Sequence, residues 1–320
     1  MSDDWTLVRD THELPNLLTE LGDFQAFESS TNIFSYASGV VQSHSDAKIM
    51  VDALTRSGLT DYLSEFFPAS YDSDLARFEL KYDSMQYPNY RRFLDKTIGS
   101  KLIVPDTSIL IDRVITRRLL AYLGNEKAKQ VRLARVSTLE LEALYQKDNG
   151  QPKSRSGFCE VRLLSGLGAK FLASLPWNVI IEYSEMLRSG KKSIRLGGDP
   201  AIRKEILEYV QDQRDRMPVS GKIVGDKIPA NIILITSDFA FALASFGEGI
   251  SSLYLMKKKF TERNTNYVQL ALLVNEYAIN AKSNLVLKGE SSEIEIQGFW
   301  PMKTFYDLLE GRLRVRVRRY

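Results

Sequence analysis

Four carboxylate side chains stand where predicted strands give way to helices, and acids in that setting can do chemistry together. They belong to Asp106, Glu140, Asp199 and Asp238. Each has an ordinary structural interpretation, because Asp caps the first N–H groups of a helix and Glu suits the helix dipole. If the four meet at one edge of a sheet, they repel one another, and a divalent cation that prefers oxygen ligands relieves that repulsion. Such a site can activate a bound water and neutralise charge on a phosphodiester.

The residues that other kinds of catalytic site require, cysteine and histidine, are scarce in this sequence. The chain of 320 residues contains one cysteine, Cys159, and two histidines, His12 and His44. A Cys/His zinc site therefore lacks ligands, and histidine-based nucleophilic catalysis would need long-range convergence with little choice of base. A single cysteine excludes an intramolecular disulfide framework and fits a reducing compartment. We expect a cytoplasmic protein without a membrane partner, since no apolar run is long enough to cross a bilayer.

Any nucleic-acid-binding surface must come from local clusters of basic residues, because the charge of the whole chain is small. The formal net charge is +3, which by itself does not indicate nucleic acid. The segment RLRVRVRRY (312–320) alternates in period two, which predicts a strand with an arginine face for phosphates or, alternatively, a solvated protective edge. A second basic segment, RSGKKSIR (188–195), is predicted to be a loop near the acids. The predicted nucleic-acid-binding residues are Arg312, Arg314, Arg316, Arg318, Lys191 and Lys192.

The elements that position the acids alternate between strand and helix from residue 101 to about residue 260. Predicted strands are 101–106, 134–136, 177–183, 231–238 and 250–256, and predicted helices are 115–129, 137–147, 199–215 and 239–247. A further predicted helix, 267–281, follows this region. Such alternation is typical of a parallel sheet covered by helices. In that arrangement strand ends and the following helix starts share one edge, so the four acids would face a common cleft.

The flanking segments have a different character. Residues 1–98 contain helical patterns, the longest over 45–67, and predict a mostly helical N-terminal domain. Residues 99–281 form the predicted α/β domain, and residues 282–320 a C-terminal β-rich basic element with a hairpin around GESS (289–292).

Three stretches resemble the PIN domain, a family of metal-dependent ribonucleases similar in fold to the FEN-type nucleases. The stretches are VPDTSILID (104–112), LELEALYQKDNGQPKSRSGFCEVRLL (139–164) and LITSDFAFALASFGEGISSLYL (234–255). The middle stretch is similar to a form seen in archaeal PIN proteins. On this resemblance Asp106, Glu140 and Asp238 are the first, second and last acids of the family's site.

The third acid departs from the family's pattern. The family usually has it opening a helix shortly before the last acid. Asp199 begins an apolar-periodic helix and is the preferred residue, whereas Asp226 lies closer to the expected distance but in a predicted loop.

The resemblance implies a three-layer sandwich around a central parallel sheet. It also implies an endoribonuclease that cleaves RNA with a water activated by Mg²⁺ or Mn²⁺, held by Asp106, Glu140, Asp199 and Asp238. Supporting roles fall to Ser108, Thr236, Ser237 and Glu142. Two alternatives stay open: a non-catalytic RNA-binding or ribosome-associated scaffold, and a toxin-type ribonuclease of a toxin–antitoxin pair. Expected partners are RNA, a ribosome or RNA-processing complex, and a second copy of the chain.

Overall fold

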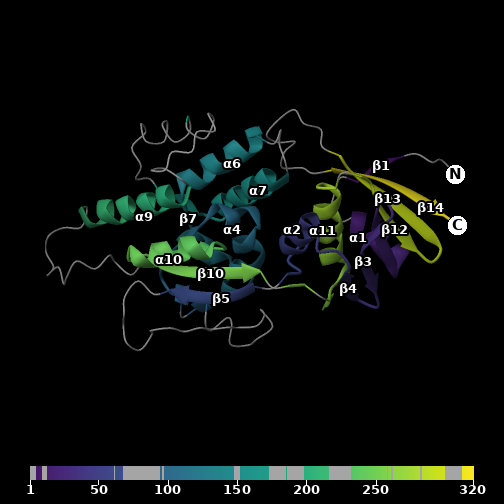
Figure 1. Ribbon diagram of the computed structural model, residues 1–320, viewed down its shortest axis with the longest axis horizontal. Coiled ribbons are helices and arrows are strands. Elements are labelled where there is room, and N and C mark those ends of the chain that lie inside the picture. Colours follow the sequence, from purple (N-terminus) through teal and green to yellow (C-terminus); the bar gives the residue numbers. More distant parts are fainter. Residues whose placement is uncertain are drawn as a thin grey trace. The chain divides into compact units, whose positions relative to one another are not determined.

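The computed structural model describes residues 5–8, 13–60, 62–67, 94–95, 97–147, 152–172, 185, 198–215, 232–257, 259–260, 262–281, 283–299 and 312–320. The chain divides into two compact units (Figure 1). Unit 1 comprises Met1–Asp61 and Lys258–Tyr320, and unit 2 comprises Tyr62–Lys257.

Unit 1 contains the largest sheet, eight strands in the order β1-β14-β13-β12-β2-β3-β4-β11, all antiparallel. Its strands are β1 (Thr6–Val8), β2 (Phe24–Glu28), β3 (Thr31–Ala37), β4 (Val40–Ser43), β11 (Glu262–Asn264), β12 (Leu285–Gly289), β13 (Ser292–Phe299) and β14 (Arg312–Arg319). Strands from the two ends of the chain are thus hydrogen-bonded neighbours. The hairpin predicted around GESS is confirmed as β12 and β13.

The described helices of unit 1 are α1 (Glu13–Leu21), α2 (Lys48–Arg56) and α11 (Tyr267–Ala278), and their apolar side chains share one core with the sheet. The contact between α11 and β13 is close. A Cβ added at Gly298 would lie 2.5 Å from the carbonyl oxygen of Ala278 and 2.7 Å from Cα of Ile279. Gly298 therefore permits an approach between backbones that any side chain would prevent.

The predicted fold class is wrong in two respects. Residues 6–43 contribute four strands, so the N-terminal segment is not mostly helical, and the helix predicted over 45–67 ends at Arg56. The central sheet is also not the expected parallel one: the largest sheet is antiparallel, and the sheet that carries the acids is small and mixed, unlike the predicted PIN-like three-layer sandwich. The pairing of β2 with β12 joins segments about 250 residues apart, so no local pattern reveals it.

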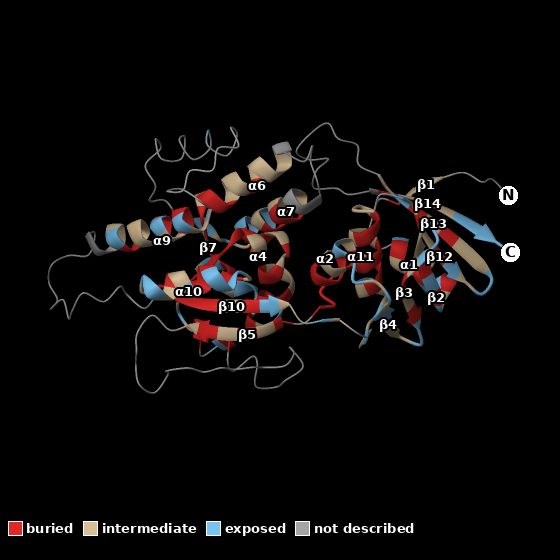
Figure 2. Ribbon diagram, viewed as in Figure 1, coloured by how far each residue is buried: buried red, intermediate tan, exposed pale blue. Residues whose placement is uncertain are grey.

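Unit 2 is built on a four-stranded sheet in the order β5-β10-β9-β6. These strands are β5 (Tyr62–Phe67), β6 (Leu102–Pro105), β9 (Ile232–Thr236) and β10 (Ser251–Lys257). Strands β6, β9 and β10 are parallel neighbours, whereas β5 is antiparallel to β10. Every residue of the central strand β9 is buried, as its unbroken apolar run IILIT predicts. Alternate residues of β5 and most residues of β10 are buried as well (Figure 2).

The helices of unit 2 connect and cover these strands. They are α4 (Thr107–Ile111), the π-helix η1 (Ile115–Leu119), α5 (Leu120–Leu123), the 3₁₀-helix η2 (Asn125–Gln130), α6 (Arg135–Lys147), α7 (Pro152–Gly166), α9 (Gly198–Asp215) and α10 (Phe239–Gly247). Two short parallel strands, β7 (Arg132–Leu133) and β8 (Lys170–Phe171), form a separate pair.

Several predicted elements of unit 2 are confirmed within a few residues, namely β6, β9, β10, α6, α9 and α10. The predicted strand 134–136 is wrong, because β7 ends at Leu133 and α6 begins at Arg135. The single helix predicted over 115–129 is instead three short segments, since Gly124 adopts φ 92° and interrupts it. The predicted strand 177–183 lies outside the described residues. No helix among the described residues is long and apolar enough to span a membrane.

Candidate active site

Asp106 follows the last residue of β6 and is 5% exposed. Its Oδ1 accepts a hydrogen bond from the backbone N–H of Thr107 at 2.6 Å. Its Oδ2 accepts from the hydroxyls of Ser108 at 2.7 Å and Thr236 at 2.9 Å. Burial raises the pKa of Asp106 and the charge of Asp238 adds to this, while the three hydrogen bonds oppose it. The residue is therefore both the cap of α4 and a carboxylate fixed at the strand end.

Asp238 follows the neighbouring strand β9 and is exposed. Its Oδ1 accepts from the backbone N–H of Phe241 at 3.0 Å, so Asp238 caps α10. Its own N–H donates to the Thr236 hydroxyl at 3.0 Å. Beside it, the hydroxyls of Ser237 and Ser108 lie 2.8 Å apart. Because β6 and β9 are parallel neighbours, these two strand ends bring Asp106 and Asp238 to the same edge.

Asp199 lies in the first turn of α9 and belongs to the same electrostatic group. Partial burial raises its pKa to about 6, and the negative charges of Asp106 and Asp238 add to the rise, whereas Arg203 lowers it. Like charges that shift one another's pKa lie within a few ångströms to about a nanometre. Three of the four predicted acids therefore interact, although they come from three different elements.

Glu140 joins this group through a hydroxyl. It lies on α6, and its Oε2 accepts a hydrogen bond from the Thr107 hydroxyl, next to Asp106 in the chain. Glu142 is half-buried on the same helix. Two residues correspond to roughly 200° around a helix, so Glu142 does not share the face of Glu140. The predicted alternative Asp226 lies outside the described residues.

Sequence reasoning missed Glu205, a fully buried carboxylate that connects two of these helices. It lies on α9 and accepts from the backbone N–H groups of Arg135 at 2.8 Å and Val136 at 3.2 Å, the first residues of α6. Burial raises its pKa to about 7, against these hydrogen bonds and the charge of Arg135. Glu205 thus fixes the start of the helix that carries Glu140. Its signal in the sequence is an acid on an otherwise apolar helix face.

The oxygen atoms at the site determine whether it suits a divalent metal. Carboxylate and hydroxyl oxygens are the ligands that Mg²⁺ and Mn²⁺ prefer. Among the described residues, however, no three His, Cys, Asp or Glu side chains lie close enough to hold one ion. Since Mg²⁺ keeps several waters and needs only one or two carboxylates from the protein, the acids fit a hydrated ion but do not form a closed cage.

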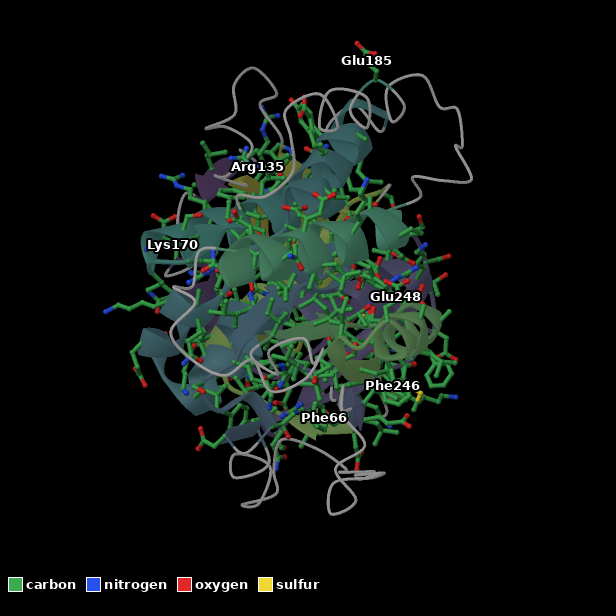
Figure 3. All side chains as sticks on the ribbon, turned by 90° about the vertical axis from the view of Figure 1, so that its left-hand side faces the viewer. Phe66, Arg135, Lys170, Glu185, Phe246 and Glu248 are labelled. Carbon is green, nitrogen blue, oxygen red and sulfur yellow. The ribbon has the colours of Figure 1, made fainter. Side chains whose placement is uncertain are left out.

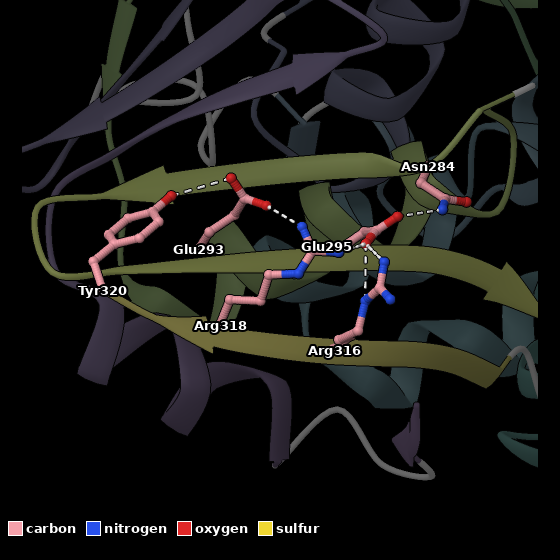
Figure 4. A network of polar contacts seen from close by, with 6 residues as sticks. All are labelled: Asn284, Glu293, Glu295, Arg316, Arg318 and Tyr320. Carbon is pink, nitrogen blue, oxygen red and sulfur yellow. Dashed lines mark hydrogen bonds and ion pairs between the residues drawn. The ribbon is translucent and has the colours of Figure 1, made fainter. Parts of the chain in front are cut away.

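The predicted RNA-binding arginines lie in unit 1, on β14. Figure 4 shows two of them, Arg316 and Arg318. Arg316 is ion-paired with Glu295 on β13, and Arg318 lies 3.4 Å from Glu293 and 3.6 Å from Glu295. Partial burial would raise the pKa of Glu295, but hydrogen bonds from Arg316 and Asn284 and the arginine charges lower it. Two of the arginines therefore already have carboxylate partners in the sheet.

Arg314 is half-buried on β14, and only the backbone of Arg312 is described. Lys191 and Lys192 lie outside the described residues. The guanidinium of Arg316 also lies 5.0 Å from the ring centre of Trp5, a cation–π contact on the same sheet.

Comparison of the chain with protein-family models, with curated proteins and with solved structures returned no match.

Proposed function

We propose that unit 2 is a divalent-metal-dependent endoribonuclease, the activity that its motif resemblance to PIN-domain ribonucleases implies. The observation that carries the proposal is that Asp106 and Asp238 follow neighbouring parallel strands and share the Thr236 hydroxyl. The pKa of Asp199, raised first by burial and then by the charges of Asp106 and Asp238, supports it. A protein that needed these residues only as helix caps would gain nothing from placing three like charges together. A bound cation removes that penalty.

The residues of the chain have distinct roles in this proposal. Asp106 and Asp238 would hold a hydrated Mg²⁺ or Mn²⁺ ion, and Asp199 would add negative charge without being a third direct ligand. When bound, the ion would supply an activated water and neutralise phosphate charge. Thr236 and Ser108 orient Asp106 through their hydroxyl groups. The remaining acid, Glu140, is oriented by Thr107. We place this activity in the cytoplasm, with RNA as the partner and arginines of β14 as additional phosphate contacts.

The test compares RNA cleavage by the full chain in Mn²⁺, in Mg²⁺ and in EDTA, using single-stranded and structured RNA. Asp238→Asn and Asp199→Asn should each lower the cleavage rate at least about a hundredfold. The reason is that weaker metal binding removes several kcal/mol of stabilisation of the charge that develops in the transition state. Asp212→Asn, on the same helix α9 but more than three turns away, is the matched control and should leave the rate unchanged. Equal rates in EDTA, or full activity of both site variants, would refute the proposal.

The alternative is a non-catalytic RNA-binding or ribosome-associated scaffold. One observation favours it: the described acids do not form a group able to enclose an ion. The same experiment separates the two functions. A scaffold binds RNA in EDTA and in metal alike, and it shows no cleavage with either cation.

A further inference from the structure

Phe239 is an exposed aromatic residue at the candidate active site. It directly follows Asp238 and is the first residue of α10, yet its side chain is 48% exposed. One turn further along the helix, Leu243 is 49% exposed. Single exposed apolar residues are common, but a phenylalanine adjacent to a candidate catalytic acid has a specific position that favours a function.

The ring of Phe239 is held in place by two other aromatic rings. Tyr254 on β10 lies 5.4 Å away at 72°, and Phe67 at the end of β5 lies 6.0 Å away at 67°, both edge-to-face. Phe246, labelled in Figure 3, lies 6.2 Å from Phe67 and extends this aromatic group along α10. Such contacts restrict the orientation of a ring and are stabilising. Phe239 is therefore both exposed and held by its neighbours.

The aromatic group is also tied to the acids. Tyr254 is the partner of Thr236 in the parallel register of β9 and β10, and Thr236 donates to Asp106. The charge of Asp238 adds to the effect of burial in raising the pKa of the Tyr254 hydroxyl. A group lying on the ring of Phe239 would thus be close to the carboxylates.

We infer that Phe239 stacks against an unpaired base of the RNA substrate and so selects single-stranded RNA at this site. Every base has an aromatic face, and stacking on phenylalanine or tyrosine is the usual way in which proteins bind single strands. Bases inside a duplex stack on one another and cannot offer that face. A ring already fixed by its neighbours loses little entropy on binding. This inference rests on the proposed function for the choice of RNA as ligand.

The experiment measures base stacking separately from cleavage. The full chain is titrated in EDTA onto short single-stranded RNAs that carry 2-aminopurine at one position, and the fluorescence of that base is recorded. Phe239→Leu removes the ring but keeps an apolar side chain, and Phe239→Trp keeps a stacking surface. Leu243→Ala is the control for general loss of exposed apolar area, and thermal unfolding of each variant reports on the fold.

We expect quenching of 2-aminopurine at one position by the wild type, by Phe239→Trp and by Leu243→Ala. Phe239→Leu should lose the quenching and bind about tenfold more weakly, within the range of about 1–3 kcal/mol for one base–aromatic stack. Double-stranded RNA should show no dependence on Phe239.

Two results would overturn the inference. One is equal quenching and affinity for Phe239→Leu and wild type. The other is equal loss of RNA affinity in Phe239→Leu and Leu243→Ala without quenching, which indicates general apolar contact with the RNA rather than stacking of a base on Phe239. Because the titration contains no metal, quenching without cleavage in Mn²⁺ refutes only the nuclease. Metal-dependent cleavage that does not depend on Phe239 refutes only the stacking.

Discussion

Thr236 donates a hydrogen bond from its hydroxyl to Oδ2 of Asp106 over 2.9 Å, and so joins the ends of two neighbouring parallel strands. The same hydroxyl accepts the N–H of Asp238 at 3.0 Å. One buried side chain thus sets the relative positions of two acids that are 132 residues apart in the sequence.

Replacing this hydroxyl should damage both stability and activity. Thr236→Val leaves the N–H of Asp238 without this acceptor and removes a donor from Asp106, so we expect a loss of about 1–3 kcal/mol in the free energy of unfolding. Metal-dependent cleavage should fall as well, because Asp106 loses its orientation. Thr236→Ser keeps the hydroxyl and should retain most of both properties. Urea unfolding and cleavage rates of the two variants test this. Equal unfolding free energies and equal cleavage rates for Thr236→Val and Thr236→Ser would contradict the prediction.

The raised pKa of Asp199 predicts how metal affinity depends on pH. With a pKa of about 6, Asp199 is ionised at pH 7.5 and becomes protonated as the pH falls through 6. A cation must then displace a proton, so Mn²⁺ affinity should fall by up to about tenfold per pH unit below 6. Calorimetry in buffers of different ionisation enthalpy should detect proton release on binding near pH 5.5. Asp199→Asn should lack this component, and pH-independent affinity of the wild type between pH 5 and 7.5 would contradict the assignment.

Glu205 predicts a pH dependence of stability that does not involve metal. Its folded-state pKa of about 7 lies above its usual value of 4.5, so between these values the folded state holds a proton that the unfolded state has released. Stability due to this group is therefore greatest below pH 4.5 and falls as the pH rises to 7, by at most about 3 kcal/mol. Glu205→Gln should flatten that part of the stability curve.

The measurement for Glu205 is chemical unfolding of the apoprotein at intervals between pH 4.5 and 8. Asp212→Asn, on the same helix, is the control and should retain the wild-type slope. An unchanged slope in Glu205→Gln would mean that the buried carboxyl does not titrate in this range.

Gly157 and Gly166 on α7 form a matched pair for testing the packing of α6. A Cβ at Gly157 would lie 2.4 Å and 2.9 Å from the two methyl carbons of Leu141, which is fully buried on α6. Overpacking of about 1–3 kcal/mol should exceed the gain of at most about 1 kcal/mol from alanine's helix propensity, so Gly157→Ala should lower the melting temperature. A Cβ at Gly166 meets nothing within 4 Å, so Gly166→Ala should be neutral or slightly stabilising. A higher melting temperature for Gly157→Ala would show that Leu141 can move aside.

The arginine face of β14 predicts a change in the salt dependence of RNA binding. If Arg314 and Arg316 contact phosphates, replacing both with Gln should reduce the slope of log K against log salt by about two, without altering sequence preference. Because Arg316 is paired with Glu295, the same variant should lose at most about 1 kcal/mol of stability. Binding measured at several salt concentrations tests the first effect. An unchanged slope with a lowered melting temperature would mean that these arginines only hold the sheet together.

Local sequence patterns determined the elements around the candidate site. The apolar run of β9 and the helical periodicity of α9 and α10 are short-range features, and Asp106 and Asp238 follow their strands as predicted. For the same reason the adjacent β12–β13 hairpin was predictable, since its strands pair across a short turn. The capping interpretation of Asp106 is confirmed, because one carboxylate oxygen accepts the N–H of Thr107 while the other accepts two hydroxyl hydrogen bonds. Its role as a metal ligand stays a prediction.

Only the tertiary structure decided which distant segments pair and which polar groups become buried. The register of β2 with β12 and of β1 with β14 depends on contacts between the two ends of the chain, and no residue spacing encodes such contacts. The role of Glu205 likewise depends on a neighbouring helix start, which supplies the two N–H groups that its carboxylate accepts. Periodicity and capping act within a few residues, whereas sheet pairing and burial follow from the free energy of the whole chain. For that reason the alternation of strands and helices predicted a shared sheet edge for the acids, but it did not predict their burial or their hydrogen-bond partners.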